Sequence, residues 1–195
     1  MIENHMHKIL VLFAHPALQK SIAHKSLFNE IQNIEGITCH DLYDTYPDSF
    51  IDIKHEQTLL LNHDIIVLQF PLYWYSCPAI LKEWQDLVLE HGFAYGEYGD
   101  KLVGKKIMLA ISTGGSMNSY STAGYNEHDI SQFLLPFSQM SKLCNLEYLT
   151  PFVVHDIHKR HDPARIARKA KEYRQLLLTL QQQNDDAVAA RQENC

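Results

Sequence analysis

Several patterns that mark common classes of protein are missing from this chain of 195 residues. Its four cysteines, Cys39, Cys77, Cys144 and Cys195, lie far apart and form no CxxC pair. This spacing argues against a zinc knuckle and a disulfide framework, and it is typical of a reducing compartment. No apolar run approaches the roughly 20 residues that span a bilayer, and the short polar start indicates no secretion signal. We therefore expect a cytoplasmic protein.

Basic stripes and glycine-rich nucleotide motifs are also missing. The net charge is -6 and is spread without blocks of one sign, so no positive surface is predicted for a nucleic acid. Only eight glycines are present, and they form neither GxGxxG nor GxxxxGK[ST]. The sequence therefore argues against nucleic acid as a partner, against a dinucleotide-binding Rossmann turn and against a P-loop.

Short runs of aliphatic and β-branched residues recur along the chain, at residues 8–14, 37–41, 64–70, 106–112 and 146–154. Such runs are typical of a parallel sheet that is covered by helices on both faces. Five strands alternating with about five helices predict a doubly wound α/β fold, for which we expect the strand order 2-1-3-4-5. We assign one domain to residues 1–183 and expect a disordered polar tail at residues 184–195.

Two of the segments between the strands have a clear helical pattern. The first starts near Pro78 and carries an apolar stripe through Ile80, Leu81, Trp84, Leu87 and Val88. The second follows the capping residue Asp162 and carries a stripe through Ile166, Ala170, Tyr173, Leu177 and Leu180. Residues 92–104, with their spaced glycines and three aromatic residues, are predicted to form a surface excursion.

The loop after the first strand, AHPALQKSIAHKSLF, ends where a helix is predicted to start. Ser21 would lie at that start, so its hydroxyl, the free N–H groups of residues 21–24 and the helix dipole could hold a phosphate. His15 could add a donor. The alternative is a simple capping role for Ser21 and a turn role for His15, because serine is a common helix cap.

The loop after the third strand, PLYWYSCP, gathers aromatic residues where the chain leaves the sheet. Rings at this position can pack on a planar ligand, and the backbone of residues 72–74 can bind its polar edge. Core packing is the alternative. Successive side chains of an extended chain diverge, however, so Tyr73, Trp74 and Tyr75 cannot all enter the core. At least one of the three rings should face a cleft or a partner.

The loop after the fourth strand, STGGSMNSYSTAGYNEHD, contains the adjacent Gly114 and Gly115. Without Cβ atoms, these residues let the backbone approach a flat ligand and direct N–H groups at it. This would suit a flavin, because preorganised donors stabilise the negative charge of its reduced ring. For this motif taken alone, a plain β-turn is the alternative.

Together, the three loops resemble the phosphate, ring-edge and ring-face sites of the flavodoxin-like NAD(P)H:quinone reductases. Within that family, the segments LYDTYPDSFID, QFPLYWYSCPAILKEW, HGFAYG and STGG are most similar to ancillary proteins of glutathione-regulated potassium-efflux systems and to general-stress oxidoreductases. The resemblance covers about residues 8–180. It implies a flavodoxin-like fold, bound FMN, NADH or NADPH as co-substrate, and a two-fold homodimer with the flavin cleft at the subunit boundary.

The resemblance also implies the residues of the site. Those that would hold the FMN phosphate and ribityl chain are His15, Ser21, Ile22, Ala23 and His24. Those that would hold the ring are Pro71, Leu72, Tyr73, Trp74, Ser112, Thr113, Gly114 and Gly115. The family's reductases use a Tyr and a His after this loop to manage charge during hydride transfer. Tyr120 matches the Tyr, and the His position could align with Asn126, Glu127 or His128, of which we assign His128.

The function implied by the resemblance is two-electron reduction of a quinone or a similar electrophile by NAD(P)H through FMN. The alternative is a regulatory subunit that binds FMN and docks on a potassium-efflux transporter, which would place it peripherally at the inner membrane. Both roles can hold for one protein.

Two further patterns resemble sites. The histidines of VVHDIHKRH, at positions 155, 158 and 161, lack the closed ligand set that zinc needs, so we predict no metal site. Cys77 precedes a proline at a predicted helix start, where the pKa of a thiol tends to fall. A buried and inert thiol is nevertheless the favoured interpretation for Cys77.

Overall fold

A computed structural model describes residues 6–157 and 162–182. Its strands (β), α-helices (α) and 3-10 helices (η) are, in chain order, β1 (Ile9–Phe13), η1 (Leu18–Lys20), α1 (Ile22–Ile31), β2 (Ile37–Asp41), α2 (Leu42–Thr45), α3 (Ile53–Leu61), β3 (Ile65–Pro71), α4 (Ala79–Val88), β4 (Lys106–Ser112), η2 (Met117–Ser119), α5 (Ile130–Phe133), α6 (Leu135–Leu143), β5 (Glu147–Tyr148), β6 (Phe152–Val154) and α7 (Pro163–Gln182). The predicted tail, residues 184–195, lies outside the described residues.

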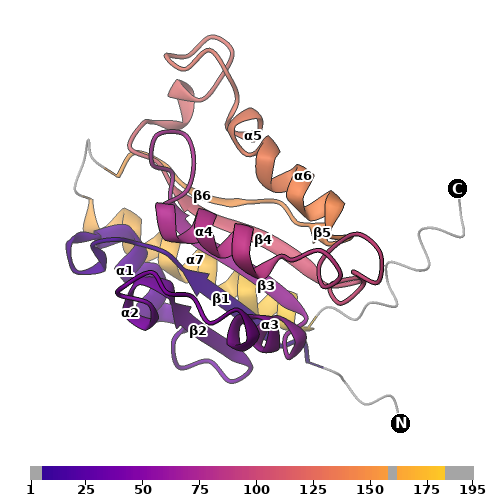
Figure 1. The fold of residues 1–195 in the computed structure, drawn as a ribbon. Coiled ribbons are helices and arrows are strands. Elements are labelled where there is room, and N and C mark those ends of the chain that lie inside the picture. The colour runs from indigo at the N-terminus through magenta and orange to yellow at the C-terminus, as the bar shows by residue number, and fades with distance from the viewer. Residues whose placement is uncertain (1–5, 158–161, 183–195) are drawn as a thin grey trace, which may run out of the picture.

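The strands form one parallel sheet in the order β2-β1-β3-β4-β5, which confirms the predicted doubly wound α/β topology (Figure 1). Leu12 of β1 pairs with Leu68 of β3, which pairs in turn with Leu109 of β4. Every residue of these three central strands is buried. Their continuous apolar character follows from this position, because helices cover both faces of the sheet.

The predicted fifth strand is divided into two short strands that both pair with β4. Glu147 of β5 lies beside Lys106 at the start of β4, and Val154 of β6 lies beside Ser112 at its end. Pro151 lies between the two strands and has no N–H group to donate, which explains why the ladder is interrupted there. The second strand carries the chain to the carboxyl end of the sheet.

Side chains of the sheet alternate between two hydrophobic cores. On β1, Leu10 and Leu12 belong to the core that includes Trp84 of α4. Ile9 and Val11 belong to the opposite core, which α1 and α7 cover. The two helical stripes predicted from the sequence are buried in these cores, except for Leu87, which is exposed. Among the described residues, no helix is both long and apolar enough to cross a membrane.

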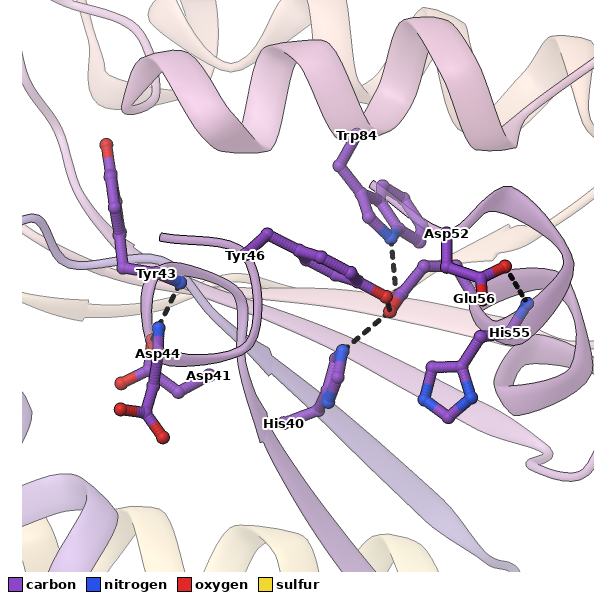
Figure 2. A network of polar contacts seen from close by, with 9 residues as sticks. All are labelled: His40, Asp41, Tyr43, Asp44, Tyr46, Asp52, His55, Glu56 and Trp84. Carbon is purple, nitrogen blue, oxygen red and sulfur yellow. Dashed lines mark hydrogen bonds and ion pairs between the residues drawn. The ribbon is translucent and has the colours of Figure 1, made fainter. Parts of the chain in front are cut away.

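A buried polar network joins α3 and α4 to the edge strand β2 (Figure 2). Glu56 of α3 is fully buried, and its Oε1 accepts hydrogen bonds from the Tyr46 hydroxyl and from Nε2 of His40, each at 2.6 Å. Its Oε2 accepts a hydrogen bond from Nε1 of Trp84 at 2.8 Å. Burial alone would raise the pKa of Glu56, but these hydrogen bonds outweigh it and hold the pKa below its usual value.

The segment 92–104 is anchored to the protein and exposes only part of its surface. Ala94 and Leu102 are fully buried, and Phe93 packs against the same core. Tyr98, in contrast, is 79% exposed and has a positive φ of 63°. The predicted surface excursion is therefore anchored in the core by Ala94 and Leu102, and it exposes the ring of Tyr98 to solvent.

Candidate active site

A cavity of about 370 Å³ opens beyond the carboxyl end of β1. Its walls come from the loop after β1, the first turn of α1, Tyr73 and the first turn of α7. Open parallel sheets bind ligands at this edge, outside the carboxyl ends of their strands. The loops after β1, β3 and β4, in which the sequence placed the candidate site, all leave the sheet at this edge.

Ser21 caps the first turn of α1, and two backbone N–H groups of this turn have no acceptor among the described residues. Oγ of Ser21 accepts the N–H of His24 at 3.2 Å, so the capping role foreseen as an alternative is present. Within the described chain, the N–H groups of Ile22 and Ala23 have no acceptor, as is usual at a helix start. Both residues line the cavity. An anion placed there would meet two N–H groups and the positive end of the helix dipole.

His15 supplies a further donor to this cavity. Its Nδ1 accepts the N–H of Ala17 at 3.1 Å, so the neutral ring carries its proton on Nε2. Burial lowers the pKa of His15, which favours that neutral form. Its ring lies 5.3 Å from the ring of His24 and 6.1 Å from that of Tyr73. The structure thus brings His15 together with His24 of the same segment and with Tyr73 of the loop after β3.

His24 does not line the cavity. Its side chain is buried and connects two loops. Its Nε2 forms a hydrogen bond of 2.8 Å with Oγ of Ser112, at the end of β4. Burial, with a smaller contribution from the nearby His15, lowers the pKa of His24 to about 3. The imidazole is therefore neutral at physiological pH. It ties the start of α1 to the STGG loop rather than offering a charge to a ligand.

The loop after β3 uses most of its backbone donors internally. The N–H of Leu72 donates to the Ser112 carbonyl at 2.8 Å, and the N–H of Tyr73 donates to the Pro71 carbonyl at 2.9 Å. In the described structure, the N–H of Trp74 has no acceptor. Of residues 72–74, whose backbone is expected to bind a ring edge, Trp74 has the one N–H group without an acceptor among the described residues.

The three aromatic residues of this loop are all accessible. Tyr73 is 42% exposed, Tyr75 47% and Trp74 94%. Trp74 and Tyr75 both have a positive φ, so the chain turns sharply away from the sheet here. The prediction that at least one ring faces a cleft or a partner agrees with this exposure.

The STGG loop divides into two buried side chains and two free backbone donors. Ser112 and Thr113 are buried, and the N–H of Thr113 donates to the Val154 carbonyl at 3.0 Å. The N–H groups of Gly114 and Gly115 have no acceptor within the described chain. A Cβ atom on Gly115 would lie 3.2 Å from Cε2 of Tyr120. Gly115 thus keeps the backbone close to Tyr120, and neither glycine has a positive φ.

Comparison with known proteins shows the family to which the chain belongs. A family model described as a flavodoxin-like fold matches residues 7–177. The chain belongs to this flavodoxin-like family. It is also 49% identical to a "glutathione-regulated potassium-efflux system ancillary protein KefG" from Serratia proteamaculans (strain 568), over 148 residues that cover 76% of this chain and 81% of the relative.

Solved structures of two flavodoxin-like relatives are similar over nearly their whole length. General stress protein 14 from Treponema denticola, solved in complex with FMN, is 38% identical with a TM-score of 0.85, covering 89% of this chain and 99% of that one. An NADPH-quinone reductase from P. pentosaceus is 32% identical with a TM-score of 0.79, covering 87% of this chain and 97% of that one.

The residues proposed for charge management are only partly brought together. Tyr120 is half-buried, and burial, together with the nearby Tyr75, raises its pKa, so its hydroxyl stays protonated. His128 is exposed, and Phe133 has ring contacts with both His128 and Tyr120, at 6.1 and 5.7 Å. Asn126, the first of the three aligned positions, accepts a hydrogen bond from the Tyr75 hydroxyl at 3.2 Å.

A histidine that sequence reasoning did not place in this flavodoxin-like site lies beside Tyr120. The ring of His155 is 5.8 Å from that of Tyr120, and its Nδ1 forms a hydrogen bond of 2.9 Å with Oγ1 of Thr113. His155 reaches this place because β6 pairs with the end of β4. In the sequence it belongs to a histidine series with His158 and His161, and those two lie outside the described residues.

Cys77 is less buried than the favoured interpretation expects, but the pKa of its thiol is not lowered. Its side chain is partly buried, and burial raises the pKa of its thiol despite hydrogen bonds that lower it. A thiol of this kind is a poor nucleophile at neutral pH. The helix start at Pro78 therefore does not create a reactive cysteine.

We expect Gly114→Val to remove flavin binding while the fold persists. The branched side chain would occupy the space beside the two free N–H groups of the STGG loop, where a flat ligand must approach. Bound flavin per chain should fall about tenfold or more, since close contact along the ring is lost. Flavin absorbance gives the occupancy, and far-ultraviolet circular dichroism checks the fold.

The smaller Gly114→Ala change serves as the graded control and should retain more flavin than the valine variant. Full occupancy in Gly114→Val would show that the ring does not lie against this residue.

Proposed function

We propose that this protein is an FMN-dependent NAD(P)H:quinone oxidoreductase that transfers two electrons from NADH or NADPH to a quinone or a similar electrophile. The observation that carries the proposal is the set of backbone donors that have no acceptor within the described chain. Two of them, at Ile22 and Ala23, line the cavity at the start of α1, and three belong to Trp74, Gly114 and Gly115. FMN has one phosphate and one flat polar ring, which match these two groups.

The donor set fits FMN better than FAD. A single helix start can hold one phosphate, and the chain has no glycine fingerprint for a pyrophosphate. The cavity beside α1 is also lined by Lys20 and by His15, whose Nε2–H is free to donate. The relative from Treponema denticola was solved with FMN, which supports the same choice.

Each part of the site would have a distinct task. FMN, when bound, supplies the hydride chemistry, while the protein positions it and sets its electrostatics. The N–H groups of Gly114 and Gly115 would stabilise negative charge on the ring. Tyr73 and Trp74 would line the cleft and exclude water. Tyr120 keeps its proton and would offer it as a hydrogen bond to the reacting groups. His128 remains the residue that we propose for proton transfer.

A direct test is to release the bound cofactor by heat, identify it by chromatography, and measure turnover with NADH or NADPH and a quinone. We expect FMN at close to one molecule per chain and reduction of the quinone with either nucleotide. Recovery of FAD as the sole nucleotide would contradict the choice of cofactor. An FMN-loaded protein that reduces no quinone would contradict the enzymatic role.

We also propose that two chains form a homodimer and that the partner chain completes the cleft. Trp74 and Tyr98 are large aromatic residues that are 94% and 79% exposed, and exposed rings of this size are typical of interfaces. In a two-fold dimer each contact occurs twice, so a single change weakens two symmetric places. Loss of the dimer should therefore also weaken the hold on FMN.

We expect Tyr98→Asp to weaken dimerisation at least about tenfold, because it places two charges in an apolar interface. Aspartate tolerates the positive φ at this position, so the monomer should remain folded. Sedimentation of the wild type, of Tyr98→Asp and of the control Leu143→Asp, another exposed apolar position, would compare the three. A wild type that sediments at micromolar concentration as a fully active monomer would refute the proposal.

The second candidate is a regulatory role on a potassium-efflux transporter. It is favoured by the relative from Serratia proteamaculans, which is named as an ancillary protein of such a system. This role would place the protein in the cytoplasm at the inner membrane surface. Co-purification with the transporter, set beside quinone turnover of the same preparation, separates the two roles. Transporter binding without turnover would favour regulation alone, and turnover without binding would favour the enzyme alone.

A further inference from the structure

We propose that His40, His55 and Glu56 form a binding site for a divalent transition-metal ion, with Zn²⁺ as the reference ion. The site lies at the carboxyl end of the edge strand β2 and at the first turn of α3, and none of its residues lines the candidate FMN cavity. The inference is independent of the proposed reductase function. It also departs from the expectation of no metal site, which considered only the histidines at 155, 158 and 161.

The first observation is the geometry of the three side chains. One ligand atom from each residue lies within 4.8 Å of the others. The His40 and His55 rings are 5.8 Å apart, and Figure 2 shows both imidazoles on one side of the Glu56 carboxylate. Ligand atoms around a tetrahedral zinc lie about 3.3 Å apart, given bonds of about 2.0–2.1 Å. His55 is exposed, so a rotation of its side chain can close the remaining gap.

The second observation is the charge of the site. Glu56 is an acidic side chain that is fully buried, and its Oε1 lies 2.6 Å from Nε2 of His40. Among the described residues, its hydrogen-bond donors are Tyr46, Trp84 and His40, with neither a lysine nor an arginine. Buried charges are normally paired or coordinate a metal. A divalent ion would compensate this carboxylate directly.

The third observation is the chemistry of the donors and of their support. Two imidazole nitrogens and one carboxylate oxygen suit Zn²⁺ and the other late first-row ions, whereas Mg²⁺ and Ca²⁺ prefer oxygen ligands alone. Tyr46 and Trp84 fix the carboxylate, as outer groups do around many metal ligands. Asp52, whose Oδ1 accepts the N–H of His55 at 3.0 Å, lies beside the site in Figure 2 and adds negative potential.

Binding would exchange one interaction for another at Glu56. In the metal-free protein, His40 Nε2 and Glu56 Oε1 share a hydrogen bond of 2.6 Å. A metal ion between these two atoms would replace the proton of this hydrogen bond, and the proton would leave to solvent. Water would complete the coordination of the ion on the side of the exposed His55. The ion would then join β2 to α3 directly, so the expected consequence is a more stable edge of the sheet.

The test uses the full chain, loaded with FMN and freed of metal by dialysis against a chelator. Zn²⁺ binding is followed by calorimetry and by the thermal midpoint, and Co²⁺ is added as a spectroscopic probe of coordination. We expect one Zn²⁺ per chain, a raised Tm, and a Co²⁺ spectrum in the visible region that indicates nitrogen and oxygen ligands. His55→Gln should weaken Zn²⁺ binding at least about tenfold, because it removes an exposed ligand and leaves the buried network in place.

Two further variants make the outcome decisive. His40→Gln keeps a donor for Glu56 but removes the imidazole, and it should weaken binding in the same way as His55→Gln. The double variant His158→Gln with His161→Gln is the matched control, and it should bind Zn²⁺ as the wild type does. The proposal is overturned if Zn²⁺ leaves the Tm of the wild type unchanged. It is equally overturned if the control variant, rather than the His55 and His40 variants, loses the binding.

Discussion

Trp84→Phe is expected to lower the free energy of unfolding by about 3 kcal/mol, which combines a cavity in the core with an unsatisfied carboxylate oxygen. Trp84 is 2% exposed, and its Nε1–H donates to Glu56 Oε2, the oxygen to which the structure gives no other donor. Phenylalanine fills less of the space and cannot donate. Denaturant unfolding should show the loss, and the Tm should fall by roughly 6–12 °C for a chain of this size.

The chain contains a natural control for this change, because its other tryptophan is at the surface. Trp74 is 94% exposed, so Trp74→Phe should shift the free energy of unfolding by less than about 0.5 kcal/mol. Equal losses in the two variants would show that the network around Glu56 does not stabilise the junction of α3 and α4. The two tryptophans also differ in environment, so their fluorescence reports which one has been removed.

His24→Asn is expected to make stability much less sensitive to acid. The pKa of His24 is about 3 in the folded protein, against an ordinary value of 6.5, so between these values only the unfolded chain binds the proton. The stability that depends on neutral His24 is therefore fully present above about pH 6.5 and is lost as the pH falls toward 3. The loss is about 1.4 kcal/mol per pH unit, or about 3 kcal/mol at pH 4.

Asparagine does not titrate in this range, so the slope of stability with pH should fall in the variant whatever its stability at pH 7. The measurement is denaturant unfolding of the wild type and of His24→Asn at several values between pH 7 and pH 4. His91→Asn, at an exposed histidine, should keep the slope of the wild type. Parallel curves for the wild type and His24→Asn would mean that the buried imidazole does not control acid stability.

The strands and the two longest helical stripes could be predicted from the sequence because one local pattern determined each of them. Residues 106–112, for example, are apolar throughout because β4 lies in the centre of the sheet, with helices on both faces. The predicted fifth strand was partly wrong, since Pro151 divides it and its two parts pair with opposite ends of β4. A break of this kind depends on register, which a hydrophobic pattern does not specify.

The candidate site was predictable at the level of loops but not of atoms. The sequence places Ser21, Trp74 and Gly114 in three loops, and the strand order brings these loops to one edge of the sheet. It does not show which N–H groups the chain uses internally, so the involvement of Leu72 and Tyr73 could not be judged. His155 was missed as a neighbour of Tyr120 because only the pairing of β6 with β4 brings it there.

The division of the last strand also bears on how the molecule behaves in a crowded solution. A long, unbroken outer strand would present a row of unpaired N–H and C=O groups, onto which another chain could add its own strand. Here β5 has two residues and β6 has three, and the Pro151 between them cannot donate. This border of the sheet is therefore a poor template for strand addition. Replacing Pro151 with a β-branched residue such as valine would lengthen the template and favour self-association at high concentration.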